Sequence, residues 1–339
     1  MDLLATPLRL SLRQKPIRMH SFKQLGDKFL EHFKQHRFPA QPSNLYEPAT
    51  YFLGIGGKRI RPVLCLMGNE LFGDINKDAY PAATAIELFH NFTLIHDDIM
   101  DKAAHRRGME TVHTKYGDNV ALLSGDIMMI AAYDELSKVS PEQLQPLLAV
   151  FNKTAREVCE GQQMDMDFEK RQEVAMDEYL HMISLKTSVL LAASLMMGAM
   201  IGGASQGNCE HLYEFGRNLG IAFQVQDDYL DAFGDPGKFG KDVGGDIKQN
   251  KKTFLLIHAL QSCSSAQREE LDNLLQSNNT DKVEKMLRIY RDCNIDDWAK
   301  QLKDTYLEKA YHHLDKVAVV SARKKPLLEL AAFLVQRDY

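Results

Sequence analysis

The stretch ELFHNFTLIHDDIMD, residues 87–101, decides the fold class of this chain. Its apolar residues recur at spacings of three and four positions, which place them on one face of an α-helix. The same spacing recurs near residues 255–260 and in LLELAAFLV at residues 327–335, whereas strand-like alternation is weak throughout. We therefore predict an all-α protein.

The chain shows no internal boundary that would divide it into domains. Glycine, proline and asparagine clusters interrupt the helical segments, but no long proline- or serine-rich linker occurs in the 339 residues. We expect a single large helical-bundle domain over residues 21–339. Residues 1–20 are expected to be a disordered or misassigned extension, with Met19 as a plausible start. The alternative is a transit-like leader, because the segment is almost free of acids.

Composition limits the classes of partner and compartment. The formal net charge of −5 gives no basic surplus, so we expect no nucleic-acid partner. The five cysteines form no CxxC pair, which favours neither a zinc site nor a disulfide framework and fits a reducing cytoplasm. The apolar run from Val189 to Gly203 is shorter than the roughly 20 residues that span a bilayer. We interpret it as a buried core helix and expect no membrane span.

Two DDxxD motifs each end an apolar helical segment. Their acidic residues are Asp97, Asp98, Asp101, Asp227, Asp228 and Asp231. In a helix, the first and last carboxylates of such a motif lie about 40° apart and about 6 Å along the axis. Like charges at this spacing destabilise a helix by about 0.2–0.5 kcal/mol, and a helix C-terminus disfavours anions. The motifs therefore predict a bound cation.

Magnesium is the natural candidate for that cation. It takes oxygen ligands, keeps several waters, and is usually held by one or two carboxylates together with substrate phosphates. Two such motifs could hold one diphosphate from both sides. A single motif could equally be an acidic helix face exposed to solvent. Two copies, each flanked by apolar residues, favour a metal site over that alternative. A calcium loop is excluded, because neither motif has the ligand pattern of an EF-hand.

Cationic and polar residues near these motifs could complete a diphosphate site. They are Lys58, Arg61, His90, Arg106, Arg107, Lys186, Thr187, Gln224, Lys238 and Lys251. Arginine suits the forked geometry of phosphate, and lysine supplies a point charge. His90 precedes Asp97 by seven residues, which places both on nearly the same helix face. Taken one at a time, these residues have simpler explanations. Lys58 and Arg61 could lie at a solvated helix start, and His90 could be a core histidine whose nitrogens are hydrogen-bonded within the protein.

The set resembles the trans-prenyltransferase, or polyprenyl synthetase, family, which includes farnesyl and geranylgeranyl diphosphate synthases. The resemblance extends from about residue 20 to the end of the chain. Its markers occur in family order: GGKRIRP (56–62), LIHDDIMD (94–101), HRRG (105–108), EGQQMD (160–165), LKTS (185–188), FQVQDDYLD (223–231) and GKFGKD (237–242) followed by KK (251–252). The resemblance implies a helical bundle of the isoprenoid synthase type with a central pocket.

The resemblance also implies roles for individual residues. The candidate catalytic residues are Asp97, Asp98, Asp101, Lys186, Asp227 and Asp228. The expected metal residues are Asp97, Asp101, Asp227 and Asp231, for about three magnesium ions per site. Isopentenyl diphosphate would be held by Lys58, Arg61, His90 and Arg107. The allylic diphosphate would be held by Arg106, Lys186, Thr187, Gln224, Lys238 and Lys251. Asp165 looks like a further acidic member, and the assembly implied is a homodimer.

Product length is expected to depend on Phe92 and Thr93, which precede Asp97 by five and four residues. In the family an aromatic residue at the fifth position blocks elongation, so Phe92 implies a short-chain product near C20 or C15. On a helical wheel, however, Phe92 lies about 140° from Asp97, so it could instead be ordinary interhelical packing, which would allow longer products.

Two other functions stay open at this stage. A terpene cyclase of similar fold would ionise the same kind of substrate, but its second metal motif normally resembles NSE or DTE, and Lys58, Arg61 and His90 would then have no purpose. A non-catalytic subunit would typically lose part of an aspartate motif, and both motifs are complete here.

Overall fold

The structure, a computed structural model, describes residues 19–234, 244–277 and 280–335. Nearly all of its regular structure is helical, which confirms the predicted all-α class. The helices are α1 (Phe22–Phe33), α2 (Ser43–Gly54), α3 (Ile60–Glu70), α4 (Ala79–Met100), α5 (Val112–Tyr116), α6 (Asp118–Leu136), α7 (Pro141–Lys170), α8 (Met176–Ile183), the π-helical turn η1 (Ser184–Ser188), α9 (Val189–Ile201), α10 (Gln206–Phe233), α12 (Gly245–Lys248), α13 (Phe254–Ser262), α14 (Ser265–Leu275), α15 (Lys282–Asp292), α16 (Ile295–Lys316) and α17 (Ser321–Val335).

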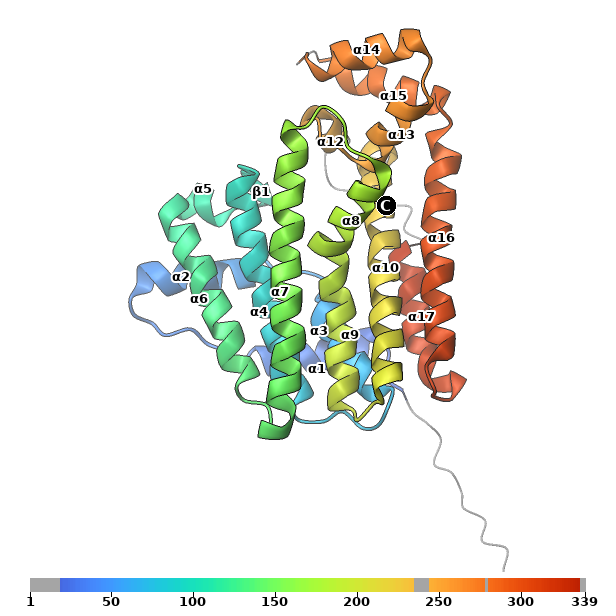
Figure 1. Cartoon of the computed structure of the whole chain (residues 1–339). Helices are drawn as coiled ribbons and strands as arrows, with labels where there is room; N and C mark the ends of the chain where they lie inside the picture. The colour runs from blue at the N-terminus through green and yellow to red at the C-terminus, as the bar shows by residue number, and fades with distance from the viewer. Residues whose placement is uncertain (1–18, 235–243, 278–279, 336–339) are drawn as a thin grey trace, which may run out of the picture.

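Long helices packed side by side form the body of the molecule (Figure 1). Helix α9 packs against α3, α7 and α10, while α4 packs against α6 and α10 against α16. Helices α14 and α15 lie at one end, beyond α13 (Figure 1). The ends of α4 and α10 carry the two DDxxD motifs, as the sequence predicted.

Helix α9 forms part of the core. Almost every residue in it is buried, because other helices cover it on several sides. The continuous segment Met176–Ile201 is long and apolar enough to cross a membrane, but 78% of its most apolar window is buried in the protein. This burial agrees with the prediction of a core helix in this region.

A two-stranded hairpin follows the first motif. Strand β1 (His105–Arg106) pairs antiparallel with β2 (Met109–Glu110), and the two turn residues, Arg107 and Gly108, both have positive φ angles. Such angles are typical of the tight turn that matches strand twist. The hairpin directs neighbouring arginines to different partners, as described below.

Candidate active site

The first acidic motif is held by cations from two other elements. Arg106 in β1 donates from Nε and Nη2 to the Asp98 carboxylate at 2.7–2.9 Å. Lys186 Nζ in η1 lies 3.4 Å from Asp97 Oδ1. Burial raises the pKa of Asp98, although the hydrogen bond from Arg106 opposes the shift. The repulsion expected among the aspartates is thus offset in part by side chains of the protein itself.

Lys186 also joins α7 to the site. Its Nζ donates to Asp165 Oδ2 at 2.6 Å. The close approach of η1 to α7 requires Gly161, because a Cβ at that position would collide with the Lys186 backbone. Burial lowers the pKa of Lys186, but attraction by Asp97 and Asp165 outweighs burial, and the pKa is raised above its usual value. The lysine is therefore charged and bridges two carboxylates.

Lys251 follows α12 and reaches the last aspartate of the first motif. Its Nζ lies 3.9 Å from both Asp101 Oδ2 and Asp246 Oδ1. Burial raises the pKa of Asp101, and repulsion by Asp97 adds to the shift. The structure therefore places Lys251 with the first motif, whereas Lys238 lies outside the described residues.

The three aspartates of the second motif have different surroundings. Asp227 lines two cavities, which are described below. Asp228 is buried and accepts hydrogen bonds from the Tyr179 hydroxyl and from Gln224 Nε2. Asp231 accepts a bond of 3.0 Å from the backbone nitrogen of Asp246 in α12. Of these three, Asp227 is the one that lines the cavities, Asp228 is buried, and Asp231 is partly exposed beside α12.

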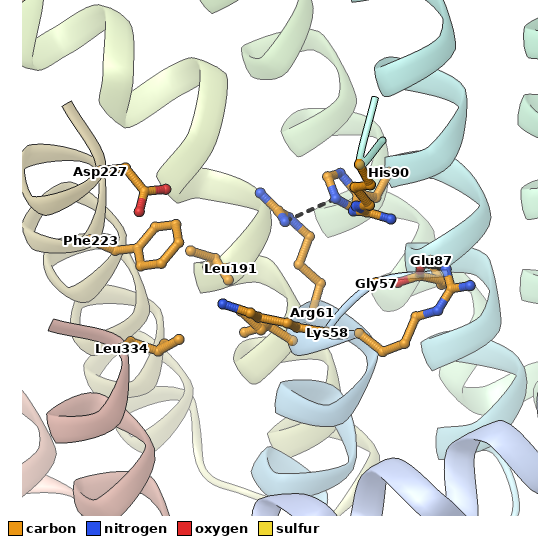
Figure 2. Close-up of a pocket in the computed structure, with 12 residues that line it drawn as sticks. Gly57, Lys58, Arg61, Glu87, His90, Leu191, Phe223, Asp227 and Leu334 are labelled. Atoms are coloured by element: carbon orange, nitrogen blue, oxygen red, sulfur yellow. Dashed lines mark hydrogen bonds and ion pairs between the residues drawn. The ribbon is translucent and has the colours of Figure 1, made fainter. Parts of the chain in front are cut away.

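A first cavity of about 510 Å³, here called the basic cavity, lies beside α3 and α4. Its lining residues are Gly57, Lys58, Arg59, Ile60, Arg61, Glu87, His90, Arg107, Leu191, Phe223, Asp227 and Leu334. Cationic side chains outnumber acidic ones in this lining. In Figure 2, Arg61 lies between His90 on one side and Phe223 and Asp227 on the other. The excess of positive charge suits a phosphate-bearing ligand.

Arg61 and His90 form one unit in this cavity. Arg61 Nη1 lies 3.1 Å from His90 Nε2 (Figure 2). Because a guanidinium only donates, His90 Nε2 is the acceptor and the imidazole is neutral with its proton on Nδ1. Burial lowers the pKa of His90 well below its usual value, and the nearby arginines lower it further. Burial also lowers the pKa of Arg61 to about 10, and its buried Nε has no hydrogen-bond partner among the described residues. This orphaned donor suits an anionic ligand.

Gly57 allows the β1–β2 hairpin to approach the loop before α3. Its φ of 147° is unusual for other residues, and a Cβ there would lie 2.6 Å from Nη1 of Arg107. Arg107 therefore lines the basic cavity, while its neighbour Arg106 binds Asp98. Arg59, at the end of the loop, forms an ion pair with Glu87 and donates to the Leu53 carbonyl at 2.9 Å.

The pair formed by Arg59 and Glu87 is expected to stabilise both the fold and the loop. Both side chains are buried, at 7% and 3% exposure. Replacing Glu87 by Gln leaves the guanidinium without its counter-ion, which should lower the free energy of unfolding by about 3 kcal/mol. The loop should also shift, raising the KM of the ligand in the basic cavity. Thermal denaturation and steady-state kinetics measure the two effects.

Glu329→Gln is the matched control, because Glu329 is exposed and its pair with Lys325 spans 3.7 Å. It should leave stability within about 0.5 kcal/mol of the native protein. Equal stabilities of the two variants would contradict the structural role of the buried pair.

A second cavity of about 430 Å³, here called the aspartate cavity, adjoins the first. Its lining residues are Arg61, His90, Phe92, Thr93, Leu94, His96, Asp97, Met100, Arg106, Val158, Cys159, Gln162, Gln163, Met166, Lys186, Thr187, Leu190, Phe223, Gln224 and Asp227. Charged groups from both motifs therefore meet at a cavity that also has apolar walls from α4 and α7. Arg61, His90, Phe223 and Asp227 line both cavities, so the two share a wall.

Phe92 lines the aspartate cavity together with Thr93. It also packs edge-on against His96, with ring centroids 4.7 Å apart, and against Phe89 at 5.6 Å. Phe92 thus packs against two residues of its own helix and lines the cavity, and its effect on product length stays a prediction.

The donor set fits a hard divalent cation. Asp97 Oδ1 is buried and has no hydrogen-bond partner among the described residues, although Lys186 lies 3.4 Å away. Within the described ranges, no three His, Cys, Asp or Glu side chains come close enough together to hold a metal ion by themselves. The buried Asp97 oxygen suits a hard cation such as magnesium, which takes few protein ligands and completes its shell with water and phosphate.

Three residues of the site were not among those predicted. Glu87 anchors the loop, Phe223 separates the cavities, and Tyr179 binds Asp228. Tyr179 lies seven residues before Lys186, and nothing in its sequence context marks it as part of a site. Phe223 is the first residue of FQVQDDYLD, and its position one turn before Asp227 could have indicated a role in the site.

An all-helical fold in which two aspartate-bearing helix ends face a cavity beside a cluster of cations defines a class of enzymes that act on diphosphates. A sequence model of the polyprenyl synthetase family matches residues 42–293. The chain belongs to the polyprenyl synthetase family, and its activity is that of a prenyltransferase.

Individual relatives agree with this assignment. A geranylgeranyl diphosphate synthase of Methanosarcina mazei is 40% identical over 88% of this chain and 91% of its own. A crystal structure of a geranylgeranyl pyrophosphate synthase superposes with a TM-score of 0.90 and 43% identity, covering 94% of this chain and 99% of the other. A polyprenyl synthase of Caulobacter crescentus, solved with calcium and isoprenyl diphosphate, gives a TM-score of 0.84 and 26% identity, covering 94% and 96%.

Proposed function

We propose that the protein is a magnesium-dependent prenyl diphosphate synthase. It joins isopentenyl diphosphate head to tail to dimethylallyl, geranyl or farnesyl diphosphate and gives a short-chain all-trans product. The product proposed is geranylgeranyl diphosphate, and the second candidate is farnesyl diphosphate. One observation carries the proposal: the basic cavity and the aspartate cavity share a wall. A condensation of two diphosphates needs two such compartments, whereas a terpene cyclase has no use for the first.

The two cavities are assigned to the two substrates by their linings. Isopentenyl diphosphate binds in the basic cavity, where Lys58, Arg61, His90 and Arg107 neutralise its diphosphate. The allylic diphosphate binds in the aspartate cavity with its chain along the apolar walls. The residues proposed to hold its head group are Arg106, Lys186, Thr187, Gln224, Lys238 and Lys251.

The reaction proposed begins with the allylic substrate. Its C1–O bond breaks, and the electron pair leaves with the diphosphate. The double bond of isopentenyl diphosphate supplies the electrons of the new bond to C1, and a proton then passes to the released diphosphate. Lys186 and Arg106 favour departure by neutralising the leaving group. Thr187 and Gln224 place oxygen atoms beside the allylic cation, and the apolar walls exclude water.

Magnesium, when bound, supplies further positive charge to the leaving diphosphate. The residues proposed to hold it are Asp97, Asp101, Asp227 and Asp231, with Asp98 and Asp228 supporting them. About three ions per site are expected.

The test of this function is an extraction assay. Purified protein, magnesium and labelled isopentenyl diphosphate are mixed with each allylic diphosphate in turn, and the products are sized after phosphatase treatment. A discrete alcohol of C20 or C15 that disappears with a chelator would support the proposal. Folded protein that incorporates no label with any primer would overturn it.

Product length is the most direct test of Phe92. Phe92→Ala removes the ring from the wall of the aspartate cavity, so the chain should grow by at least one C5 unit beyond the native product while total incorporation stays within about threefold. Chromatography of the dephosphorylated products measures the shift. Phe333→Ala, a change at a phenylalanine of α17 that is 54% exposed, should leave the product unchanged. An unaltered product from Phe92→Ala would show that the ring serves packing alone.

We also propose that the enzyme is a homodimer, with α6 in the interface. Four apolar side chains of α6 are largely exposed: Leu122, Leu123, Ile130 and Tyr133. An exposed apolar stripe of this kind is typical of a contact surface. Ile130→Glu should weaken association at least about tenfold, measured by light scattering across a dilution series. Leu328→Glu, an exposed leucine on α17, should not, and a native protein that is monomeric would contradict the proposal.

Two further expectations accompany this function. The five cysteines are all free in the structure, which supports a reducing cytoplasm as the working compartment. Residues 21–339 are proposed to act as a single synthase domain.

A further inference from the structure

The segment from α12 to Lys251 contacts both aspartate motifs. The backbone nitrogens of Gly244 and Asp246 donate to the Asp231 carbonyl at 2.6 Å and to the Asp231 carboxylate at 3.0 Å. Lys251 Nζ lies 3.9 Å from the Asp101 carboxylate of the other motif. A helix as short as α12 makes too few hydrogen bonds to hold such a position by itself. The segment that presents Lys251 to the first motif therefore needs support from elsewhere in the fold.

The start of α15 supplies this support. Lys282 Nζ donates to Asn250 Oδ1 at 2.6 Å and to the Ser277 carbonyl at 3.2 Å. Asn250 Nδ2 in turn donates to the Leu275 carbonyl at 3.0 Å. Asn250 has a left-handed φ of 57° and directly precedes Lys251. Its side-chain bonds therefore fix the direction in which the chain enters Lys251.

Lys282 is a costly residue at its position. Its side chain is buried, at 3% exposure, and both of its acceptors are neutral oxygens. Burial of a charge without a counter-ion is unfavourable, and the helix dipole opposes a cation in the first turn of a helix. An apolar residue would avoid both costs. What a lysine adds here is its hydrogen bond to Asn250.

We propose that Lys282 is a positioning residue for Lys251 in the binding of the allylic diphosphate. By holding Asn250, it keeps the Lys251 ammonium beside Asp101, where it can neutralise the head group. Without that hold, α12 retains its bonds to Asp231, but the chain after it is free to turn Lys251 away. A cation that is fixed before the substrate arrives loses less conformational freedom on binding. The inference rests on the proposed function, which assigns Lys251 to the allylic diphosphate.

The test compares the binding of the two diphosphates. Lys282→Met removes the ammonium and keeps an unbranched side chain. It should raise the KM of the allylic diphosphate about tenfold and change that of isopentenyl diphosphate less than about twofold, because other residues line the basic cavity. Calorimetric titration with geranyl diphosphate and magnesium, without isopentenyl diphosphate, should show the same loss in Kd and needs no turnover.

A double-mutant cycle separates positioning from packing. Lys251→Gln should raise the KM of the allylic diphosphate at least as much as Lys282→Met does. The variant that carries both changes should bind geranyl diphosphate no more weakly than Lys251→Gln alone, since Lys282 acts through Lys251.

Lys324→Met is the matched control. Lys324 is also buried, at 8% exposure, and donates to a neutral oxygen, the Asp315 carbonyl, at 2.8 Å. It lies outside the linings of both cavities, so its loss should lower the melting temperature and leave both KM values unchanged. If Lys282→Met does not fold, Asn250→Gly carries the test, because glycine adopts the left-handed φ but makes neither side-chain bond. The KM of the allylic diphosphate should rise in this variant too.

Each result bears on a different claim. A native KM for the allylic diphosphate in whichever of these two variants folds, or losses that multiply in the double variant, would overturn the role of Lys282. A native Kd in Lys251→Gln would overturn both that role and the assignment of Lys251. Protein that binds geranyl diphosphate but condenses nothing would overturn the proposed function and leave the positioning role standing.

Discussion

Asp97→Asn should lower kcat by at least about 10³-fold in the condensation of isopentenyl diphosphate with geranyl diphosphate. The change removes one negative charge from the wall of the aspartate cavity and replaces a buried, unpaired acceptor oxygen by an amide. It also leaves Lys186 with one carboxylate, that of Asp165, instead of two. Steady-state assays over a wide range of magnesium concentration measure the effect, and added magnesium should not restore the rate.

Asp272→Asn provides the matched control for Asp97→Asn. It makes the same chemical change in α14, where the side chain is 51% exposed and pairs with Arg268. Its kcat should stay within about twofold of the native value. If Asp97→Asn kept a tenth or more of the native kcat, Asp97 would not be one of the residues that hold magnesium.

Lys186→Gln should lower kcat by about 10²–10³-fold and raise the KM of the allylic diphosphate. Lys186 is 23% exposed and bridges Asp97 and Asp165, so it faces the position assigned to the leaving group. Its loss also leaves two carboxylates without their shared cation. Magnesium should then raise the melting temperature of the variant more than that of the native protein, because the ion takes over part of the lost charge.

The comparison variant for Lys186→Gln is Lys325→Gln, whose side chain is 74% exposed in a pair of 3.7 Å with Glu329. Both kcat and the magnesium effect should match those of the native enzyme. If magnesium stabilised Lys186→Gln no more than native protein, the lysine would be packing support and not a counter-charge.

Local periodicity accounts for what the sequence could predict of the fold. The helical spacing around residues 87–101 and the buried run after Lys186 became α4 and α9, because both patterns lie within one element. The hairpin at Arg107 was not predicted, since its strands are two residues long and carry no alternation. Its turn could have been noticed from the glycine after the arginine pair.

The site was predictable where a residue's neighbours lie on its own helix. Asp97, with His90 two turns earlier, is such a case, and both line the aspartate cavity. The partners of Asp228 and Asp231 could not be predicted, because they depend on α8 and α12 packing against α10. The helical wheel of Phe92 did not decide between its two readings, since residues of both α4 and α7 line the cavity and it is not confined to the face of Asp97.

The wall shared by the two cavities bears on how a chain is elongated. In the reaction proposed, the product keeps the diphosphate that isopentenyl diphosphate carried. The head group of each new product therefore lies in the basic cavity and must move to the aspartate cavity before the next addition. Arg61, His90, Phe223 and Asp227 border both compartments. An intermediate can therefore pass across one row of side chains to become the next allylic substrate. Elongation can then be processive, with geranyl and farnesyl units retained by the enzyme between additions instead of released and recaptured.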